Sequence, residues 1–472
     1  MVRTRALLSI VALLAIGVIC KADNPNDLAK ENAELKQRIE KLEKEMEELK
    51  KLVMQRAQAQ TQKAVQLSAP AAPVVAKPIE PNATVSKLSE ADMQKIMVMF
   101  EKEQGKKKPV WADLDVQLYG RLKLDASYDS ARTEVGNYAK WVRSSSRIND
   151  HSEFDMTANE TRLGMNISGP EYDGVKTSGR VEIDFYGGGS ENKANPMMRH
   201  AYMNIDWPRD RFSILAGQTS DVISPLYPYT MNYSVGWWAG NIGYRRPQIR
   251  LTKSYPLSKD VDLKLEGAVT RDIGNSDDFV VRDAGEDSGI PGVQARVSVQ
   301  FPWLKVQPTT IGVSGHWAKE KYYTSAAGAN EEYDSWSLNL DLTQPINGWL
   351  VLKGELFTGQ DLNAYLGGIG NGINTHLGTE IASTGGWIAA SLTPQPKWNF
   401  NFGVSVDDPE NSDLTGLGDN SRDYNRSIFG NVIYSLNKNT EIGFELSQWR
   451  TKYLEAGDND AIRAQTSFIY KF

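Results

Sequence analysis

Nine basic residues of this sequence occupy positions from which they could guide small anions. Most of them occupy the polar positions of segments in which apolar and polar residues alternate. Two of them directly follow a long connection between such segments. The set comprises Arg121, Lys123, Arg162, Arg180, Arg245, Arg246, Arg250, Arg296 and Arg463. Like charges along a narrow passage of low dielectric constant focus the electric field and concentrate counter-ions. The pattern therefore predicts a basic ladder that lines a channel.

Acidic residues of the same parity leave a second interpretation open. They are Asp125, Glu182, Asp184, Asp262, Glu266 and Glu445. Opposite charges on neighbouring strands attract one another, so the basic residues could simply pair and solvate a water-filled interior. The two interpretations differ in whether net positive charge remains on the inner wall.

A second candidate site is the aromatic segment 219–243, in which two prolines restrict the backbone. Its candidate residues are Asp221, Tyr227, Tyr229, Tyr233, Trp237 and Trp238. A loop this apolar would aggregate in water, so it must pack into the interior or against another subunit. We expect inward packing, where the loop narrows the passage, and subunit contact is the alternative. Asp221 is then the acid expected to face the arginines that follow the loop, Arg245, Arg246 and Arg250.

No arrangement of residues predicts a catalytic site, a cofactor or a metal. The four histidines, at 151, 200, 316 and 376, have no HExxH spacing. The glycine-rich segment 367–372 lacks the lysine and the setting of a phosphate-binding loop, so we interpret it as a flexible external loop. The acidic residues Asp407, Asp408, Glu410 and Asp413 could hold a divalent cation, but a solvated loop is the preferred interpretation. A barrel enzyme is not expected, because His316 has inward parity and no serine partner is recognisable.

The elements that must position these residues are β-strands. From residue 114 onward apolar residues recur at every second position, so each segment has one apolar and one polar face. The C-terminal segment 462–472 alternates in this way and ends on an aromatic residue. Phe468, Tyr470 and Phe472 lie on its apolar face and resemble the assembly signal of bacterial outer-membrane barrels.

Short and long connections alternate between the predicted strands. Short turns are expected at 169–174, 208–210, 256–260, 303–308, 345–348, 393–397 and 437–439. Long connections are expected at 130–150, 187–196, 219–243, 272–290, 320–332, 359–384, 408–425 and 454–460. These seven turns and eight loops imply 16 strands, an even number as bacterial barrels require. The sequence predicts an all-β fold, a 16-stranded antiparallel transmembrane barrel over 114–472, wide enough for a water channel.

Residues 1–22 have the pattern of a secretory signal peptide, with Arg3 and Arg5 before a short apolar run and a small-residue cleavage site. The one cysteine, Cys20, lies in this segment, so a mature chain would form no disulfide. Lipidation of Cys20 is disfavoured because Ile19 stands where a small residue is required. Loss of three basic residues would change the formal charge from −6 to −9, which argues against a nucleic-acid partner.

Residues 23–56 contain a heptad repeat. Position d holds Leu28, Leu35, Leu42 and Leu49, and position a holds Asn32, Ile39, Met46 and Val53. Such a seam is buried against other helices, so we predict a self-associating coiled coil, with a single solvated helix as the alternative. The residues at positions a and d alone would favour a coiled coil of two helices. A Pro/Ala-rich linker follows at 57–88, and a short amphipathic helix with a basic linker at 89–113.

This order of segments resembles that of the DcaP-like porins, and residues 116–142 (VQLYGRLKLDASYDSARTEVGNYAKWV) are the most family-like stretch. The resemblance implies a homotrimeric channel in the outer membrane of a Gram-negative-type bacterium, with the coiled coil in the periplasm. It implies passive diffusion of small hydrophilic solutes, with a preference for anions such as dicarboxylates. The implied partners are other copies of the chain, outer-membrane lipid and the barrel assembly machinery. The alternative is a structural protein that tethers the envelope to the cell wall through its coiled coil.

Overall fold

The computed structural model describes residues 114–146, 151–190, 193–273, 284–304, 307–324, 329–418 and 420–472. All of them belong to one unit, Met99–Phe472. The predicted signal peptide, coiled coil, linker and amphipathic helix, residues 1–113, lie outside the described residues. Within the described part, no helix is both long and apolar enough to span a membrane.

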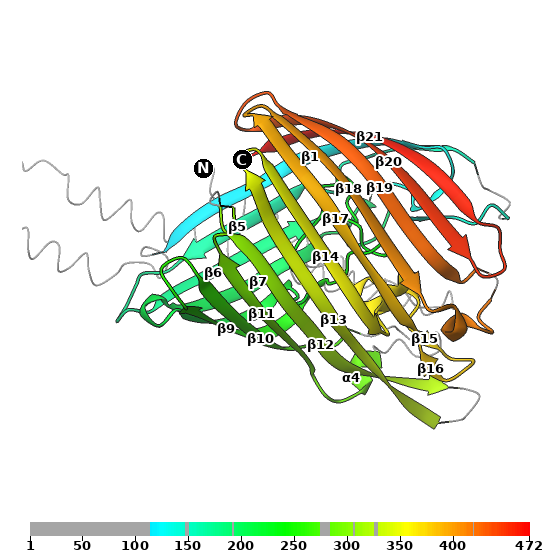
Figure 1. Ribbon diagram of the computed structural model, residues 1–472, viewed down its shortest axis with the longest axis horizontal. Helices are drawn as coiled ribbons and strands as arrows, with labels where there is room; N and C mark the ends of the chain where they lie inside the picture. Colours follow the sequence, from blue (N-terminus) through cyan, green and yellow to red (C-terminus); the bar gives the residue numbers. More distant parts are fainter. Residues whose placement is uncertain are drawn as a thin grey trace, which may run out of the picture. The chain divides into compact units, whose positions relative to one another are not determined.

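The described strands form one closed antiparallel barrel, in which they follow one another around the wall in sequence order (Figure 1). They are β1 (Asp115–Asp129), β4 (Glu153–Thr157), β5 (Arg162–Ser168), β6 (Lys176–Asp184), β7 (Met197–Trp207), β8 (Phe212–Ser220), β9 (Arg245–Pro256), β10 (Asp262–Thr270), β11 (Gly292–Phe301), β12 (Thr309–Thr324), β13 (Ala329–Asn347), β14 (Leu350–Gln360), β17 (Ala382–Gln395), β18 (Trp398–Pro409), β19 (Arg422–Ser435), β20 (Thr440–Tyr453) and β21 (Asn459–Lys471). β4 and β5 pair with successive stretches of β1, so together they are one interrupted strand. The predicted 16-stranded antiparallel barrel is confirmed.

The barrel closes between its first and last strands. β1 pairs antiparallel with β21, and Leu122 lies opposite Tyr470. The backbones of Phe472 and Gly120 exchange two hydrogen bonds, with N···O distances of 3.0 and 3.1 Å. A β-carbon at Gly120 would collide with the Phe472 ring and the Arg162 carbonyl oxygen, so glycine is required at this close approach. The C-terminal residue is therefore part of the closed wall.

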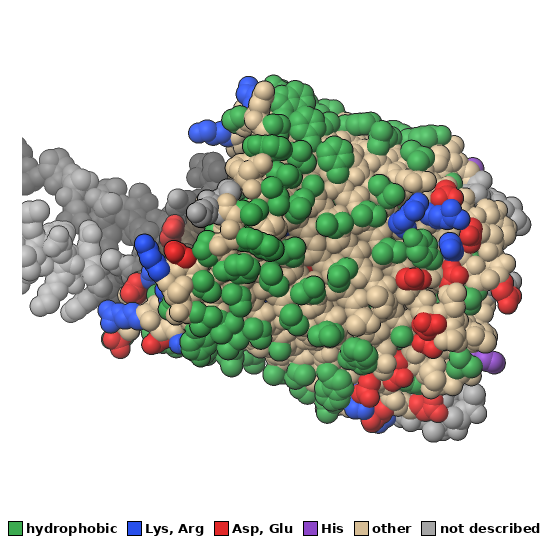
Figure 2. All heavy atoms as spheres, in the orientation of Figure 1, with side chains coloured by type: hydrophobic (Ala, Val, Ile, Leu, Met, Phe, Trp, Pro, Cys, Tyr) green, Lys and Arg blue, Asp and Glu red, His purple; other side chains and the backbone are tan. Residues whose placement is uncertain are grey.

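The wall is apolar outside and polar inside. On β1, Leu118 and Leu122 are 71% and 52% exposed, whereas Lys123 and Asp125, of opposite parity, are 5% and 4% exposed. Because neighbouring side chains of a strand point to opposite faces, the polar parity belongs to the interior. Figure 2 shows a broad hydrophobic surface over the strands, with charged side chains gathered toward the two ends. This polarity is typical of a barrel that spans a bilayer.

Exposed tryptophans mark the short-turn end of the barrel. Trp303, Trp349 and Trp398 are 61%, 46% and 40% exposed and lie in or beside short turns. Trp398 packs on Tyr434 of the next strand, with ring centroids 4.6 Å apart. Amphipathic rings of this kind collect at the boundary between lipid and water.

The predicted short turns are short in the structure, at 169–175, 208–211, 257–261, 302–308, 348–349, 396–397 and 436–439, with η2 (Pro208–Asp210) in the second. One predicted long connection is wrong, because β12 and β13 continue through most of 320–332, with Lys321 opposite Glu332. The connection predicted at 454–460 is present but shorter, with five residues, 454–458, between β20 and β21. In the β12–β13 hairpin charged residues continue the ladder beyond the apolar surface, and Lys319 pairs with Asp334 at 3.3 Å. The polar residues of this hairpin therefore do not indicate where β12 ends and β13 begins.

Four of the other long connections carry small elements of their own. These are β2 (Thr133–Val135) and β3 (Ala139–Val142), α4 (Ala284–Asp287), η3 (Asn363–Tyr365), η4 (Gly368–Gly370), β15 (Ile373–Asn374), β16 (Thr379–Glu380) and η5 (Asn411–Leu414). β3 contacts β20 and β21, and η4 contacts β17, β18 and β19. These connections therefore pack against the barrel wall and are not free in solvent.

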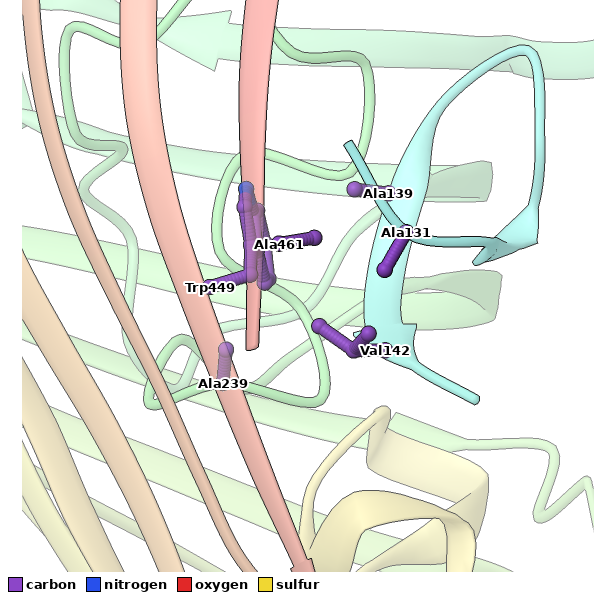
Figure 3. Close-up of a cluster of buried hydrophobic side chains, with 6 residues drawn as sticks. All are labelled: Ala131, Ala139, Val142, Ala239, Trp449 and Ala461. Carbon is purple, nitrogen blue, oxygen red and sulfur yellow. The ribbon is translucent and has the colours of Figure 1, made fainter. Parts of the chain in front are cut away.

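Apolar clusters form where loops meet the inner wall. In one of them, Trp449 of β20 and Ala461 of β21 pack with small side chains from two loops (Figure 3). Those partners are Ala131, Ala139, Val142 and Ala239. Two further clusters join the 221–244 connection to the wall, one around Phe357 and Tyr365 and one around Trp387 and Phe429. Apolar burial thus holds loops inside an otherwise polar barrel.

Candidate pore and its basic wall

The connection between β8 and β9, residues 221–244, runs through the barrel interior, and we refer to it as the inner loop. Three of its backbone N–H groups donate, each over 2.7 Å, to side chains on distant strands: Val222 to Gln294 on β11, Leu226 to Glu355 on β14 and Met231 to Glu445 on β20. The inward wall residues thereby satisfy buried backbone donors that would otherwise lack partners. The loop is therefore fixed across the interior.

The aromatic residues of the inner loop differ in exposure. Tyr233 and Trp237 are 9% and 5% exposed, whereas Tyr227 is 40% exposed. Tyr233 stacks on Tyr186 of the preceding loop, with ring centroids 3.8 Å apart. Trp237 meets Trp238 edge to face at 6.3 Å. Stacked and edge-on rings give the loop a rigid aromatic body.

Lysines lie over the two remaining aromatic candidates. The Nζ of Lys353 is 4.6 Å from the ring centroid of Tyr229, and that of Lys140 is 4.3 Å from the ring of Trp238. Burial of Lys140 on β3 lowers its pKa, while the carboxylate of Glu134 opposes this shift. Cation–π attraction thus joins the inner loop to its neighbours.

Asp221 contacts one of the three arginines expected to face it. Arg246 Nε lies 2.7 Å from Asp221 Oδ1. Arg245 instead lies over the Tyr244 ring at 4.7 Å. Arg250 donates to the Ser220 carbonyl oxygen. The three guanidinium groups therefore do not converge on a single carboxylate.

A cavity of about 440 Å³ lies between the inner loop and the wall formed by β1, β5, β6 and β7. Its basic lining residues are Arg121, Lys123, Arg162, Arg180, Arg199 and Lys471. Its acidic lining residues are Glu160, Glu182 and Glu441. Within this lining, basic side chains exceed acidic ones by three, and Tyr227, Tyr233 and Trp237 form part of the opposite side.

Two carboxylates cross-link the basic wall. Glu182 accepts from Arg180 and Arg199, each at 2.8 Å, and lies 3.6 Å from Arg162. Glu160 pairs with both Arg121 and Lys123. Both interpretations of the sequence thus have structural counterparts, because cross-strand pairing coexists with an excess of basic groups.

Five members of the predicted ladder lie outside this cavity: Arg245, Arg246, Arg250, Arg296 and Arg463. Arg296 pairs with Asp341 at 2.7 Å. Arg463 pairs with Asp129 at 2.6 Å. The structure therefore brings together Arg121, Lys123, Arg162 and Arg180, and engages the others with separate partners elsewhere.

Sequence reasoning missed several residues of the cavity. Glu160 lies at the interruption between β4 and β5, where no alternation indicates a direction. Arg199 and His200 are consecutive, yet both line the cavity. A register shift opposite Glu182 and Ile183 accounts for this, because a β-bulge sends two successive side chains to one face. The bulge depends on how β7 pairs with β6, so the sequence of β7 alone contains no clear signal for it.

Arg246 also joins the inner loop to the connection 361–381. Its guanidinium lies 3.8 Å from the ring centroid of Tyr365, and it donates to the Ala364 carbonyl oxygen at 3.2 Å. Nearby, burial and, to a smaller extent, the charges of Asp272 and Glu380 together raise the pKa of Asp361 to about 8. These contacts hold the two connections against each other.

Two interpretations of external segments need correction. The glycine-rich segment 367–372 is not a free loop, because Gly368 and Ile369 are buried in η4. Asp407 is not in a solvated loop either, since it is 0% exposed at the end of β18 and accepts from Ser383 Oγ at 2.6 Å. Among the described residues, no group of three or more His, Cys, Asp or Glu side chains could hold a metal ion.

No family model matches the sequence, and no curated protein matches it. The solved structure of the outer membrane channel DcaP of Acinetobacter baumannii matches with a TM-score of 0.63 and 17% identity, over 78% of this chain and 99% of that one. An anion-selective porin from Comamonas acidovorans matches with a TM-score of 0.48 and 14% identity, over 76% and 100%. OmpF of Salmonella typhi matches with a TM-score of 0.49 and 12% identity, over 76% and 98%. The first match confirms the resemblance indicated by the sequence: the chain has the fold of the DcaP outer-membrane channel.

Proposed function

We propose that this barrel is an outer-membrane porin through which small hydrophilic solutes diffuse passively. The observation that carries the proposal is the charged cavity of about 440 Å³ inside a wall whose outer face is apolar. Solutes that cannot dissolve in lipid need a polar, water-accessible path of this kind. The shared fold with a structure described as an outer membrane channel supports the same function.

Within this function, we propose a preference for anions, with dicarboxylates among the solutes. The excess of three basic side chains in the cavity lining supports the preference. Arg121 and Arg180 keep 27% and 35% of their side chains exposed despite their acidic partners. A planar guanidinium can bind a carboxylate through two parallel hydrogen bonds. An inorganic cation accepts no hydrogen bond and is repelled by the guanidinium charge.

We propose that the inner loop is the constriction of the passage. Its fixed course across the interior, through Gln294, Glu355 and Glu445, supports this role. A passing solute would meet the basic wall on one side and Tyr227 of the loop on the other. Selectivity would then be decided where these two surfaces approach each other.

Planar-bilayer recording of the purified protein tests this function. Stepwise conductance and an anion-selective reversal potential under a salt gradient are expected. Absence of stepwise channels would contradict the porin function. A cation-selective reversal potential would contradict the anion preference and leave the porin function intact.

The resemblance to DcaP-like porins also leads us to propose a homotrimer, folded by the barrel assembly machinery, with residues 23–56 in the periplasm. Light scattering of the detergent-solubilised protein tests the trimer. The cell-wall tether remains the alternative function, and it rests on residues outside the described part. A strain lacking residues 23–56 separates the two functions: loss of envelope attachment with unchanged conductance would support the tether.

A further inference from the structure

We propose that the outer face of the barrel binds the phosphate group of an outer-leaflet glycolipid of the lipid A type between Arg426 of β19 and Arg450 of β20. The site is separate from the interior cavity. It rests on the outer-membrane placement proposed above and on the general rule that bacterial barrels turn their long connections toward the cell exterior.

The two arginines lie side by side on the outer surface. Arg426 and Arg450 are direct partners in the β19–β20 ladder. Ile428 and Leu446 have the same parity and are 42% and 49% exposed, whereas Trp449, of opposite parity, is 2% exposed. Both arginine side chains therefore project from the lipid-facing side of the wall.

Two like charges directly opposite each other destabilise a strand pair unless something compensates them. The Nε atoms of both arginines lack a hydrogen-bond partner. Arg450 contacts Asp458 at 3.7 Å, and both side chains are about 40% exposed (41% and 42%). Such a long, solvent-screened contact contributes little. Within the described residues, Arg426 has no acidic group within ion-pair distance, whereas Arg450 has two acidic neighbours, Asp458 and its ladder partner Asp460.

The pair lies at the edge of the apolar surface. The next row toward the centre of the wall runs from Val404 through Ile428 and Gln448 to Ile462. Its three apolar members are 40%, 42% and 49% exposed. One row toward the loops, Lys452 lies over the Tyr424 ring at 5.1 Å. Figure 2 shows Lys and Arg side chains gathered beyond the hydrophobic surface near one end of the barrel.

This order of apolar and basic rows fits a phosphorylated glycolipid. Its acyl chains would cover the apolar rows, and its headgroup phosphate would lie at the level of the arginines. Cβ atoms of directly opposed residues are roughly 5 Å apart, so two guanidinium groups can bind one phosphate, and each offers a fork that matches phosphate oxygens. Asp460, the other ladder neighbour of Arg450, would repel a phosphate and thereby confine the site to the two arginines.

Thermal unfolding in non-ionic detergent tests the site with two probes, bisphosphorylated lipid A and the same lipid with its phosphates removed. The wild-type protein should be stabilised by the first probe and much less by the second. In Arg426→Gln/Arg450→Gln, the apparent affinity for the phosphorylated lipid should fall at least about tenfold, because two charge-assisted contacts are lost. The control Arg209→Gln/Lys253→Gln removes two cations at the short-turn end and should bind as the wild type does.

The single variants separate a lipid site from a structural role. Arg426→Gln and Arg450→Gln each relieve the like-charge contact, so lipid-free stability should be unchanged or higher, while stabilisation by the phosphorylated lipid should fall. Equal stabilisation of wild type and double variant, or equal effects of the two lipids, would overturn the proposal. If the double variant does not fold, unchanged lipid affinity in both single variants would overturn it. Conductance of the same samples tests the porin function separately, since neither arginine lines the cavity.

Discussion

The guanidinium Nε of Arg246 lies 2.7 Å from Oδ1 of Asp221, and the two side chains are 0% and 1% exposed. Asp221 is the first residue of the inner loop, and Arg246 is the second residue of the strand that follows the loop. The Asp221 carboxylate also accepts from the Tyr244 backbone N–H at 2.7 Å. One buried ion pair thus joins the two ends of the loop that crosses the barrel.

Asp221→Asn should destabilise the barrel by roughly 3–5 kcal/mol, because it leaves the Arg246 charge buried without its close carboxylate partner. Urea unfolding followed by tryptophan fluorescence measures the loss. The matched control is Asp262→Asn, which removes the partner of Arg211 from a 2.8 Å pair whose side chains are about half exposed. A change of less than about 1 kcal/mol is expected there. Equal losses in the two variants would contradict the importance of the buried pair.

Arg180→Gln/Arg199→Gln should shift the reversal potential toward cations. The substitutions reduce the excess of basic side chains in the cavity lining from three to one. The counterpart Glu441→Gln raises this excess to four and should shift the reversal potential in the opposite direction. Shifts of the same sign in the two variants, measured under one salt gradient, would show that the charge of this lining does not determine selectivity.

Gly240→Ala should displace the inner loop and cost about 2 kcal/mol or more. Gly240 has a φ of +111°, and an added β-carbon would lie 2.3 Å from the Gly386 carbonyl oxygen on the wall. Unfolding experiments and single-channel conductance both report the change. Gly267→Ala is the control, because its β-carbon would meet no atom within 4 Å and its effect should stay within about 1 kcal/mol. Unchanged stability and conductance in Gly240→Ala would mean that the course of the loop does not depend on the close contact between Gly240 and Gly386.

Stability should fall as the pH rises from about 4 to about 8. Burial, together with the charges of Asp272 and Glu380, raises the pKa of Asp361 to about 8, whereas an unfolded aspartate titrates at about 3.9. The folded protein therefore holds this proton more tightly than the unfolded chain, and the resulting stability is lost as the pH rises through the folded pKa. Unfolding midpoints measured from pH 5 to 9 test this, and Asp361→Asn should flatten the profile. An identical slope in the variant would assign the dependence to other groups.

Much of the wall could be predicted because its evidence is local. The alternation Leu118, Gly120, Leu122 and Leu124 already indicates one lipid-facing side, and the turns around Pro208 and Asn437 appear as breaks in the period. The hairpin of β12 and β13 could not be bounded in this way, because Lys319 and Lys321 continue the ladder with polar residues. Cross-strand pairing, which depends on the partner strand, decided where it ends.

The sequence by itself determined the barrel, its strand number and its polarity, since these follow from residue order and a period of two. The apolar composition of segment 219–243 favoured inward packing but left contact with another subunit open. Only the tertiary structure decided which charges meet. Arg199 and His200 line the cavity because of a register shift, Glu160 enters at an interrupted strand, and Arg246 alone reaches Asp221. These contacts depend on registers and loop paths that join residues far apart in the chain, and no local pattern specifies them.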